Sequence, residues 1–269
     1  MSYMIDKDPD GIIKKTDLFA LDMDGTIYLG ERWIEGAVDF LDKVKSAGKS
    51  FIFLTNNSSK NPDVYVDKLH RMGFDASKDI IETSGQASSD FLKKNHPGEK
   101  VFLLGNEMLA DEFRDDGIEL VKEGAQVVVT AFDTTLDYDK MCRVCDYVRA
   151  GLPYIETHPD FNCPTETGFI PDAGSIQAFI KASTGRDPDV IIGKPYGYII
   201  DHMLERTGAD KERTAMIGDR LYTDVAAGVN NGLTGILVLS GEAGIKDIDT
   251  SDVRPDLIFS SLKEMIPYV

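Results

Sequence analysis

The chain alternates between short runs of consecutive apolar residues and longer segments in which apolar residues recur every three or four positions. Short continuous runs are typical of strands buried in a parallel sheet, and the wider spacing is typical of helices that pack on such a sheet. Strands are predicted over 18–21, 51–54, 190–193 and 215–218. Crossover helices are predicted over 36–47 and 62–72. The alternation predicts an α/β fold.

The middle of the chain holds a second set of elements. About 140 residues separate Thr55 from Lys194, far more than one crossover connection needs. Strands are predicted there over 101–104, 127–130 and 154–157, and helices over 106–116, 138–150 and 175–183. We therefore expect a second α/β unit over 82–186, inserted into a unit made of 1–81 and 187–269. The segments 83–85 and 184–186 are the expected hinges.

Polar clusters follow four of the predicted strands. They are Asp22-Met23-Asp24-Gly25-Thr26, Thr55-Asn56-Asn57-Ser58-Ser59, Lys194-Pro195 and Asp219-Arg220-Leu221-Tyr222-Thr223-Asp224. Taken singly, Thr55 fits a turn residue, Lys194 a surface lysine and Asp219 a helix cap. Ligands of open parallel sheets bind beyond the carboxyl ends of the strands, so the four clusters together predict one shared site.

The first cluster is suited to a metal ion. Side chains alternate along a strand, so Asp22 and Asp24 are expected on the same side of the backbone. Two carboxylates this close repel each other by roughly 4 kcal/mol at an effective dielectric near 20, and a cation relieves that cost. Mg²⁺, a hard ion that prefers oxygen ligands, is the expected cofactor.

From Leu18 to about Asp256 the chain resembles the haloacid dehalogenase superfamily, and within it the NagD-like and 4-nitrophenylphosphatase-like subfamily, because all four motifs are present in order. The resemblance implies a Rossmann-like parallel-sheet catalytic core with an inserted α/β cap domain. It also implies roles for the motif residues: Asp22 as nucleophile, Asp24 as general acid and base, Thr55 and Asn56 as phosphate donors, Lys194 as the phosphate-neutralising cation, Asp22, Asp219 and the backbone carbonyl of Asp24 as magnesium ligands, and Asp224 as a supporting acid.

The predicted cap carries a polar stretch after its last strand, over 157–172. We interpret it as a loop, and Asp160, Asn162 and Glu166 are the residues expected to select the substrate through its hydroxyl groups. An ordinary surface loop is the alternative. A structural role for His158 is favoured over a catalytic one.

These residues predict a magnesium-dependent hydrolase of phosphomonoesters that acts on small phosphorylated metabolites, of the sugar phosphate or nucleotide type, through an aspartyl-phosphate. A phospho-accepting regulatory module that does not turn over is the alternative. In receiver domains, however, the phosphorylated aspartate lies on a different strand from the acidic pair, so Asp24 favours hydrolysis. An organic-halide hydrolase is disfavoured because its chemistry needs no magnesium cluster. Neither the substrate within this class nor the oligomeric state follows from the sequence.

Composition agrees with an enzyme of small molecules. The 269 residues include 29 basic and 46 acidic ones, and the net charge of −17 argues against nucleic acid or an anionic membrane as partner. No apolar run approaches the roughly 18 residues of a membrane span, and residues 1–6 do not resemble a signal peptide, so we expect a cytoplasmic protein. Cys142, Cys145 and Cys163 suggest neither a disulfide framework nor a zinc site.

Residues Asp6 to Asp17 follow the spacing of a calcium-binding loop, with Asp in place of the final Glu. Too few residues precede them for an entering helix, and a strand follows in place of an exiting helix. We therefore expect a solvated N-terminal tail without bound calcium.

Overall fold

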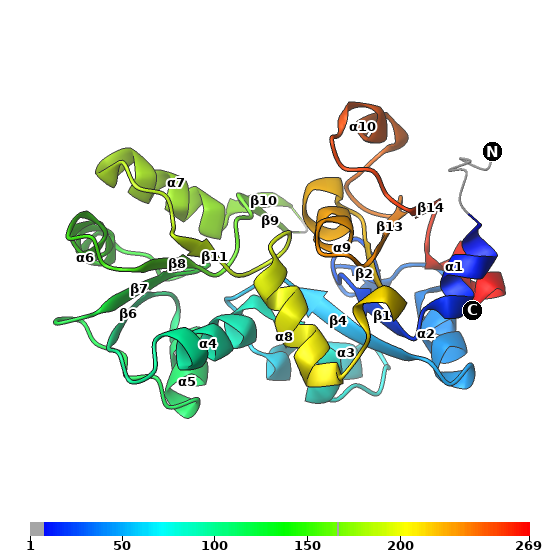
Figure 1. Ribbon diagram of the computed structural model, residues 1–269, viewed down its shortest axis with the longest axis horizontal. Helices are drawn as coiled ribbons and strands as arrows, with labels where there is room; N and C mark the ends of the chain where they lie inside the picture. Colours follow the sequence, from blue (N-terminus) through cyan, green and yellow to red (C-terminus); the bar gives the residue numbers. More distant parts are fainter. Residues whose placement is uncertain (1–7, 166) are drawn as a thin grey trace. The chain divides into compact units, whose positions relative to one another are not determined.

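The computed structural model describes residues 8–165 and 167–269, which form two compact units (Figure 1). The first unit consists of the described residues up to Thr55, together with Tyr65–Glu82 and Lys194–Val269. The second consists of Asn56–Val64 and Thr83–Gly193. Each unit has its own parallel sheet.

The sheet of the first unit has six strands in the order β14-β13-β12-β1-β4-β5. In that order the strands are Leu257–Phe259, Thr234–Val238, Thr214–Gly218, Leu18–Leu21, Ser50–Thr55 and Ile81–Thr83. β1 pairs in parallel with β12 on one side and with β4 on the other, and Leu21 stands opposite Ile217 and Phe53. The three strands therefore end at the same edge of the sheet.

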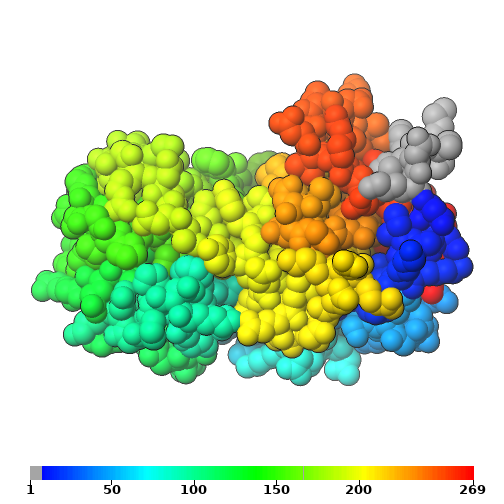
Figure 2. Space-filling model, viewed as in Figure 1, coloured from blue at the N-terminus to red at the C-terminus, as the bar shows by residue number. Residues whose placement is uncertain are grey.

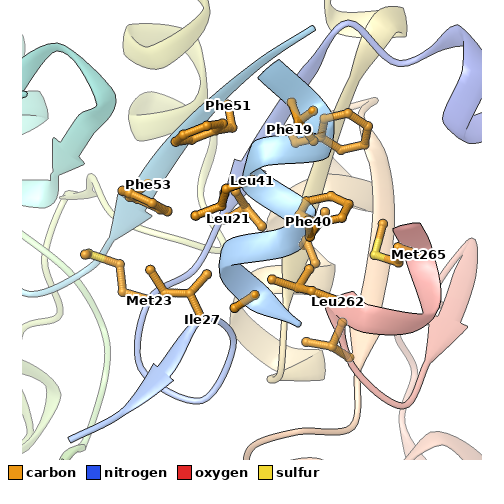
Figure 3. Packing of buried hydrophobic residues seen from close by; sticks show 14 of the residues in the cluster. Phe19, Leu21, Met23, Ile27, Phe40, Leu41, Phe51, Phe53, Leu262 and Met265 are labelled. Atoms are coloured by element: carbon orange, nitrogen blue, oxygen red, sulfur yellow. The ribbon is translucent and has the colours of Figure 1, made fainter. Parts of the chain in front are cut away.

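Helices cover this sheet and bury its apolar residues. The helices of the first unit are α1 (Pro9–Lys15), α2 (Ala37–Ser46), α3 (Pro62–Arg71), α8 (Gly197–Thr207), α9 (Ala226–Asn230), α10 (Ile245–Thr250) and α11 (Leu262–Met265). Figure 3 shows Phe40 and Leu41 of α2 packed against side chains of β1 and β4, with Leu262 of α11 beside them. Each such side chain contributes roughly 1.5–3 kcal/mol through burial. By contrast, α10 lies at the surface with no residue buried (Figure 2).

The second unit has a four-stranded sheet in the order β11-β8-β7-β6. In that order the strands are Val190–Ile191, Tyr154–Glu156, Val127–Thr130 and Val101–Leu104. Its helices are α4 (Ser84–Asn95), α5 (Glu107–Asp115), α6 (Tyr138–Arg149) and α7 (Ala173–Thr184). The predicted α/β class is confirmed, with a parallel sheet in each unit.

The chain leaves the second unit later than the boundary at 186 that we expected. β11 pairs in parallel with β8, placing Val190 opposite Ile155, so the chain up to Gly193 stays with the second unit. Asn56–Val64 also pack in this unit, where Ser58 Oγ accepts a hydrogen bond of 3.0 Å from the Phe132 backbone N–H.

Two segments predicted as irregular are regular. In place of a solvated tail, residues after Asp8 form α1, where the Asp8 side chain accepts from Asp10 N at 3.1 Å and Ile13 is buried. Asp10 and Gly11 therefore lie in a helix, which a calcium loop would not allow; Asp6 lies outside the described residues. The 157–172 stretch contains a hairpin of β9 (Asn162–Thr165) and β10 (Gly168–Pro171) in place of a simple loop.

A further hairpin follows the first acidic cluster. It consists of β2 (Tyr28–Leu29) and β3 (Arg32–Trp33). The two strands are antiparallel, and Tyr28 stands opposite Trp33 and Leu29 opposite Arg32. Among the described residues, no helix has the length and hydropathy that crossing a bilayer requires.

Candidate active site

The carboxyl ends of three adjacent strands carry Asp22, Thr55 and Asp219. Asp22 follows β1 directly, Thr55 is the last residue of β4, and Asp219 follows β12. The Asp22 backbone N–H donates to Ile217 O at 2.8 Å, which continues the sheet pairing into the site. The edge of the sheet therefore holds these three residues side by side.

Lys194 reaches the same place by a different route from the one predicted. The apolar run 190–193 belongs to the sheet of the second unit and not to the core sheet, so Lys194 does not follow a core strand. Its side chain is 1% exposed. Its Nζ donates to Asp22 Oδ1 at 2.6 Å, to Asp224 Oδ1 at 2.7 Å and to Leu54 O at 2.9 Å. The ammonium thus links two carboxylates and the end of β4.

The acidic residues form one compact cluster. One carboxylate oxygen from each of Asp22, Asp219 and Asp224 lies within 4.8 Å of the other two. Burial, followed by the negative charges of Asp22 and Asp224, raises the pKa of Asp219 from 3.8 to about 7. Burial and Asp22 raise the pKa of Asp224 to about 6, although Lys194 opposes the shift. The cluster carries more negative charge than its single buried lysine balances, and three carboxylate oxygens suit a hard divalent cation.

Backbone groups hold the two later acids in place. Asp219 Oδ2 accepts from Glu242 N at 2.7 Å, and Asp224 Oδ2 accepts from Arg220 N at 3.1 Å. Gly25 adopts φ 91°, and a Cβ there would lie 2.3 Å from Asp219 Oδ2. Only glycine fits that turn, because a side chain would be strained and would also collide with the carboxylate.

Asp24 stands apart from the buried cluster. Its side chain is 50% exposed, and its Oδ1 lies 4.0 Å from Lys68 Nζ. The same ammonium lies 3.4 Å from the ring centroid of buried Tyr28. A half-exposed carboxyl group is suited to exchange protons with a bound molecule.

The remaining predicted residues lie in the second unit or outside the described chain. Asn56 belongs to that unit, where its Nδ2 donates to Asp160 Oδ2 at 3.1 Å. His158 is fully buried, with Nδ1 3.6 Å from Asp160 Oδ2 and Nε2 3.4 Å from Asp172 Oδ1. Asn162 is exposed on β9, and Glu166 lies outside the described residues. Of the three predicted selecting residues, Asp160 is therefore part of a buried polar group.

Sequence reasoning missed Lys68, Tyr28 and Glu242. Lys68 sits on a predicted helix and resembles any solvated lysine in the sequence, and Tyr28 resembles any core aromatic. Glu242 contributes a backbone N–H, which no residue type signals. The role of each residue can be seen only in the folded structure, where Lys68 and Tyr28 lie near Asp24 and the Glu242 backbone N–H donates to Asp219.

The raised pKa of Asp219 predicts a pH-dependent stability. Between 3.8 and about 7, folded Asp219 keeps a proton that the unfolded chain has released, so its contribution to the free energy of unfolding is present below 3.8 and is lost as the pH rises through 7. With chelator present, Asp219→Asn should therefore gain stability relative to wild type as the pH rises from about 5 to about 8. Added divalent cation should restore the stability of the wild-type protein at high pH but not that of the variant.

Denaturant unfolding at a series of pH values, with chelator and with added cation, measures this difference. Parallel stability curves for the two proteins in chelator would contradict the electrostatic account of the cluster.

Known protein families and solved structures resemble this chain over most of its length. A family model described as haloacid dehalogenase-like hydrolase matches residues 19–119, and one described as HAD-hydrolase-like matches residues 191–265. An acid sugar phosphatase of Staphylococcus aureus (strain MRSA252) is 34% identical over 255 residues, covering 94% of this chain and 98% of that protein.

Two solved structures share the whole fold. A 4-nitrophenylphosphatase from Thermotoga maritima is 44% identical with a TM-score of 0.92, covering 95% of this chain and 98% of that one. NagD from E. coli K-12 is 30% identical with a TM-score of 0.86, covering 93% and 98%. The chain therefore belongs to the haloacid dehalogenase-like hydrolases and is an enzyme of the phosphatase type, in the NagD-like and 4-nitrophenylphosphatase-like subfamily.

Proposed function

We propose that this protein is a magnesium-dependent phosphomonoester hydrolase that works through an aspartyl-phosphate on Asp22, with sugar phosphates or nucleotides as its substrate class. One observation carries the proposal: Asp22 lies at a strand end, 2.6 Å from the buried ammonium of Lys194 and within the three-carboxylate cluster. A nucleophile, a cation for the phosphate and a set of metal-type ligands thus occupy one place.

In the first step, a carboxylate oxygen of Asp22 attacks phosphorus, and the bond from phosphorus to the alcohol oxygen breaks. Asp24 gives its proton to the departing oxygen, which leaves as the alcohol. Thr55 and Asn56 donate hydrogen bonds to the phosphate oxygens, and Lys194 balances their charge. Splitting the displacement into two steps lowers the barrier of each.

In the second step, Asp24 takes a proton from water. The water oxygen attacks phosphorus, the Asp22–phosphorus bond breaks, and inorganic phosphate leaves. One side chain thus serves as acid and then as base, which its exposure of 50% allows.

Formal charges support a divalent cation. With Asp24 protonated, the charges of Asp22, Asp219 and Asp224 sum to −3 against +1 from Lys194, so an anionic phosphate would meet a net negative site. Asp22, Asp219 and the Asp24 carbonyl are the proposed ligands of Mg²⁺. Both Asp224 oxygens accept hydrogen bonds, one from Lys194 Nζ and one from Arg220 N, which suits a supporting role. When bound, Mg²⁺ supplies charge neutralisation and orients the phosphate.

Phosphate release from a panel of metabolite phosphates, with Mg²⁺ and with chelator, tests the proposal. We expect turnover with Mg²⁺ and its loss with chelator. A stable phosphoenzyme without released phosphate would instead favour the regulatory alternative.

The net charge of −17 supports small phosphorylated metabolites over nucleic acid or membranes as partners. A cytoplasmic location is also part of the proposal.

We further propose that Asn162 and Glu166 select the substrate, while Asp160 acts mainly through the buried group with Asn56 and His158. In Asn162→Ala, the ratio of the kcat/KM values for two sugar phosphates should change by an amount equivalent to roughly 1–3 kcal/mol, the value of a lost hydrogen bond. The kcat/KM for 4-nitrophenyl phosphate should remain nearly unaffected. Asp160→Ala should lower thermal stability as well, because it leaves the polar groups around it unsatisfied.

The substrate panel measured on both variants checks this division, and Thr165→Ala, on the same exposed strand, is the matched control. A uniform drop across all substrates in Asn162→Ala would show that β9 does not discriminate between them.

A further inference from the structure

Lys68 of α3 brings a positive charge to the carboxyl group of Asp24. The Lys68 Nζ lies 4.0 Å from Asp24 Oδ1, and the Lys68 side chain is only 17% exposed. Opposite charges at this distance attract each other, and the low exposure of the Lys68 side chain limits screening by water. The contact is therefore strong enough to affect where the half-exposed Asp24 side chain lies.

Tyr28 provides a rigid support for the ammonium. The ring is fully buried, and its centroid lies 3.4 Å from Lys68 Nζ, a cation–π geometry. The Tyr28 carbonyl accepts from Gly25 N at 2.9 Å, and Trp33 packs edge-on against the ring at 6.5 Å between centroids. The turn that carries Asp24 and the ring that carries Lys68 are thus one connected unit.

The helix that carries Lys68 is also held firmly. Tyr65 and Leu69, on either side of Lys68 in α3, are buried in the core. Just past the end of α3, the Met72 carbonyl accepts from Trp33 Nε1 at 2.9 Å. The β2–β3 hairpin is therefore tied both to α3 and to the Asp24 turn, so the distance between Lys68 and Asp24 is set by packing.

We propose that Lys68 is a positioning residue for the acid–base reaction of Asp24: supported on Tyr28, it holds the Asp24 carboxyl group in the orientation from which it can reach the leaving oxygen. This inference rests on the function proposed above. The proton moves from Asp24 to the alcohol oxygen as the bond from phosphorus to that oxygen breaks, so the orientation of the Asp24 carboxyl group decides whether the proton reaches that oxygen.

The consequence depends on the leaving group. An alkyl alcohol must receive a proton to leave, whereas 4-nitrophenolate leaves without one. Lys68→Met keeps the length of the side chain and removes its charge. In this variant the ratio of kcat/KM for an alkyl phosphate to kcat/KM for 4-nitrophenyl phosphate should fall about 10- to 100-fold, part of the roughly 10²–10⁴-fold that general acid catalysis supplies. We use kcat/KM because it ends with departure of the leaving group and excludes the hydrolysis step that both substrates share. Lys68→Arg should restore most of the ratio, because it keeps the charge over the ring.

Arg71→Met is the matched control. Arg71 lies one turn along the same helix, is 61% exposed, and has its Nη2 3.7 Å from Glu31 Oε1. Its loss removes the same charge from α3 and should leave the ratio unchanged. Far-UV circular dichroism and thermal unfolding of every variant verify that the fold is intact.

A double-mutant cycle decides how Lys68 acts. If it acts through Asp24, then Lys68→Met should have little further effect in an Asp24→Asn background. An equal loss on both substrates, an unchanged ratio, or a full additional loss in Asp24→Asn would each overturn the proposal, the last by showing that Lys68 binds substrate directly. Asp22→Asn separates this outcome from the parent proposal: if that variant still turns over, the proposed function fails regardless of the Lys68 result.

Discussion

Replacing Asp22 with asparagine should reduce phosphate release to below about 1% of wild type on every substrate, because a carboxamide is a far weaker nucleophile than a carboxylate. The fold should survive, since Asn has nearly the same volume and can still accept a hydrogen bond from Lys194 Nζ. Steady-state phosphate release and thermal unfolding measure the two effects separately.

Asp42→Asn, an exposed acid on α2, is the matched control and should retain full activity. Turnover by Asp22→Asn at more than about 1% of wild type would falsify the covalent role of this side chain.

Lys194→Met should be the most damaging single change to the site. Its ammonium is 1% exposed and donates to Asp22, Asp224 and Leu54 O, so its loss leaves buried charges without their cation. We expect about 3–5 kcal/mol lower stability at pH 8, as for other broken buried pairs. Turnover should fall by at least roughly 10²-fold through lost charge stabilisation.

The pH dependence of this loss has a definite sign. The pKa of Asp224 is already about 6 beside Lys194, and without the lysine it rises further. Protonation of the carboxylates at low pH then replaces the missing cation, so the stability difference between Lys194→Met and wild type should shrink from pH 8 to pH 5. Denaturant unfolding at both pH values measures it, and Lys181→Met, at an exposed ion pair, is the control. A difference that does not depend on pH would contradict the charge balance described for the site.

Much of the fold was predictable because local pattern and tertiary burial agree. The runs 101–104 and 127–130 coincide with β6 and β7, and the helix predicted over 36–47 contains α2. In each case a continuous apolar run is buried on both faces of a sheet, or one helical stripe packs on it.

The pattern fails where assignment depends on long-range pairing. The run 190–193 has the composition of a core strand, yet β11 adds to the edge of the second sheet, and no local feature distinguishes the two sheets. Likewise the exposed residues of β9 and β10 show no apolar alternation, so their sequence predicts a loop where the structure has a hairpin.

The candidate site divides in the same way. Asp22, Thr55 and Asp219 could be predicted because each adjoins a strand end that is visible in the sequence. Lys68 and Tyr28 could not be predicted. Their proximity to Asp24 comes from the packing of α3 and of a short hairpin whose strands have two residues each.

If the proposed mechanism holds, the phosphoryl group is bonded to Asp22 before water releases it as phosphate. In Asp24→Asn, 4-nitrophenyl phosphate can still phosphorylate Asp22, since its leaving group needs no proton, but the water that releases phosphate has lost its base. We expect a rapid burst of about one 4-nitrophenolate per enzyme, followed by slow turnover, with phosphate found by mass spectrometry on the peptide that contains Asp22. Release of 4-nitrophenolate without a burst, or phosphate attached to any other residue, would contradict the proposed mechanism.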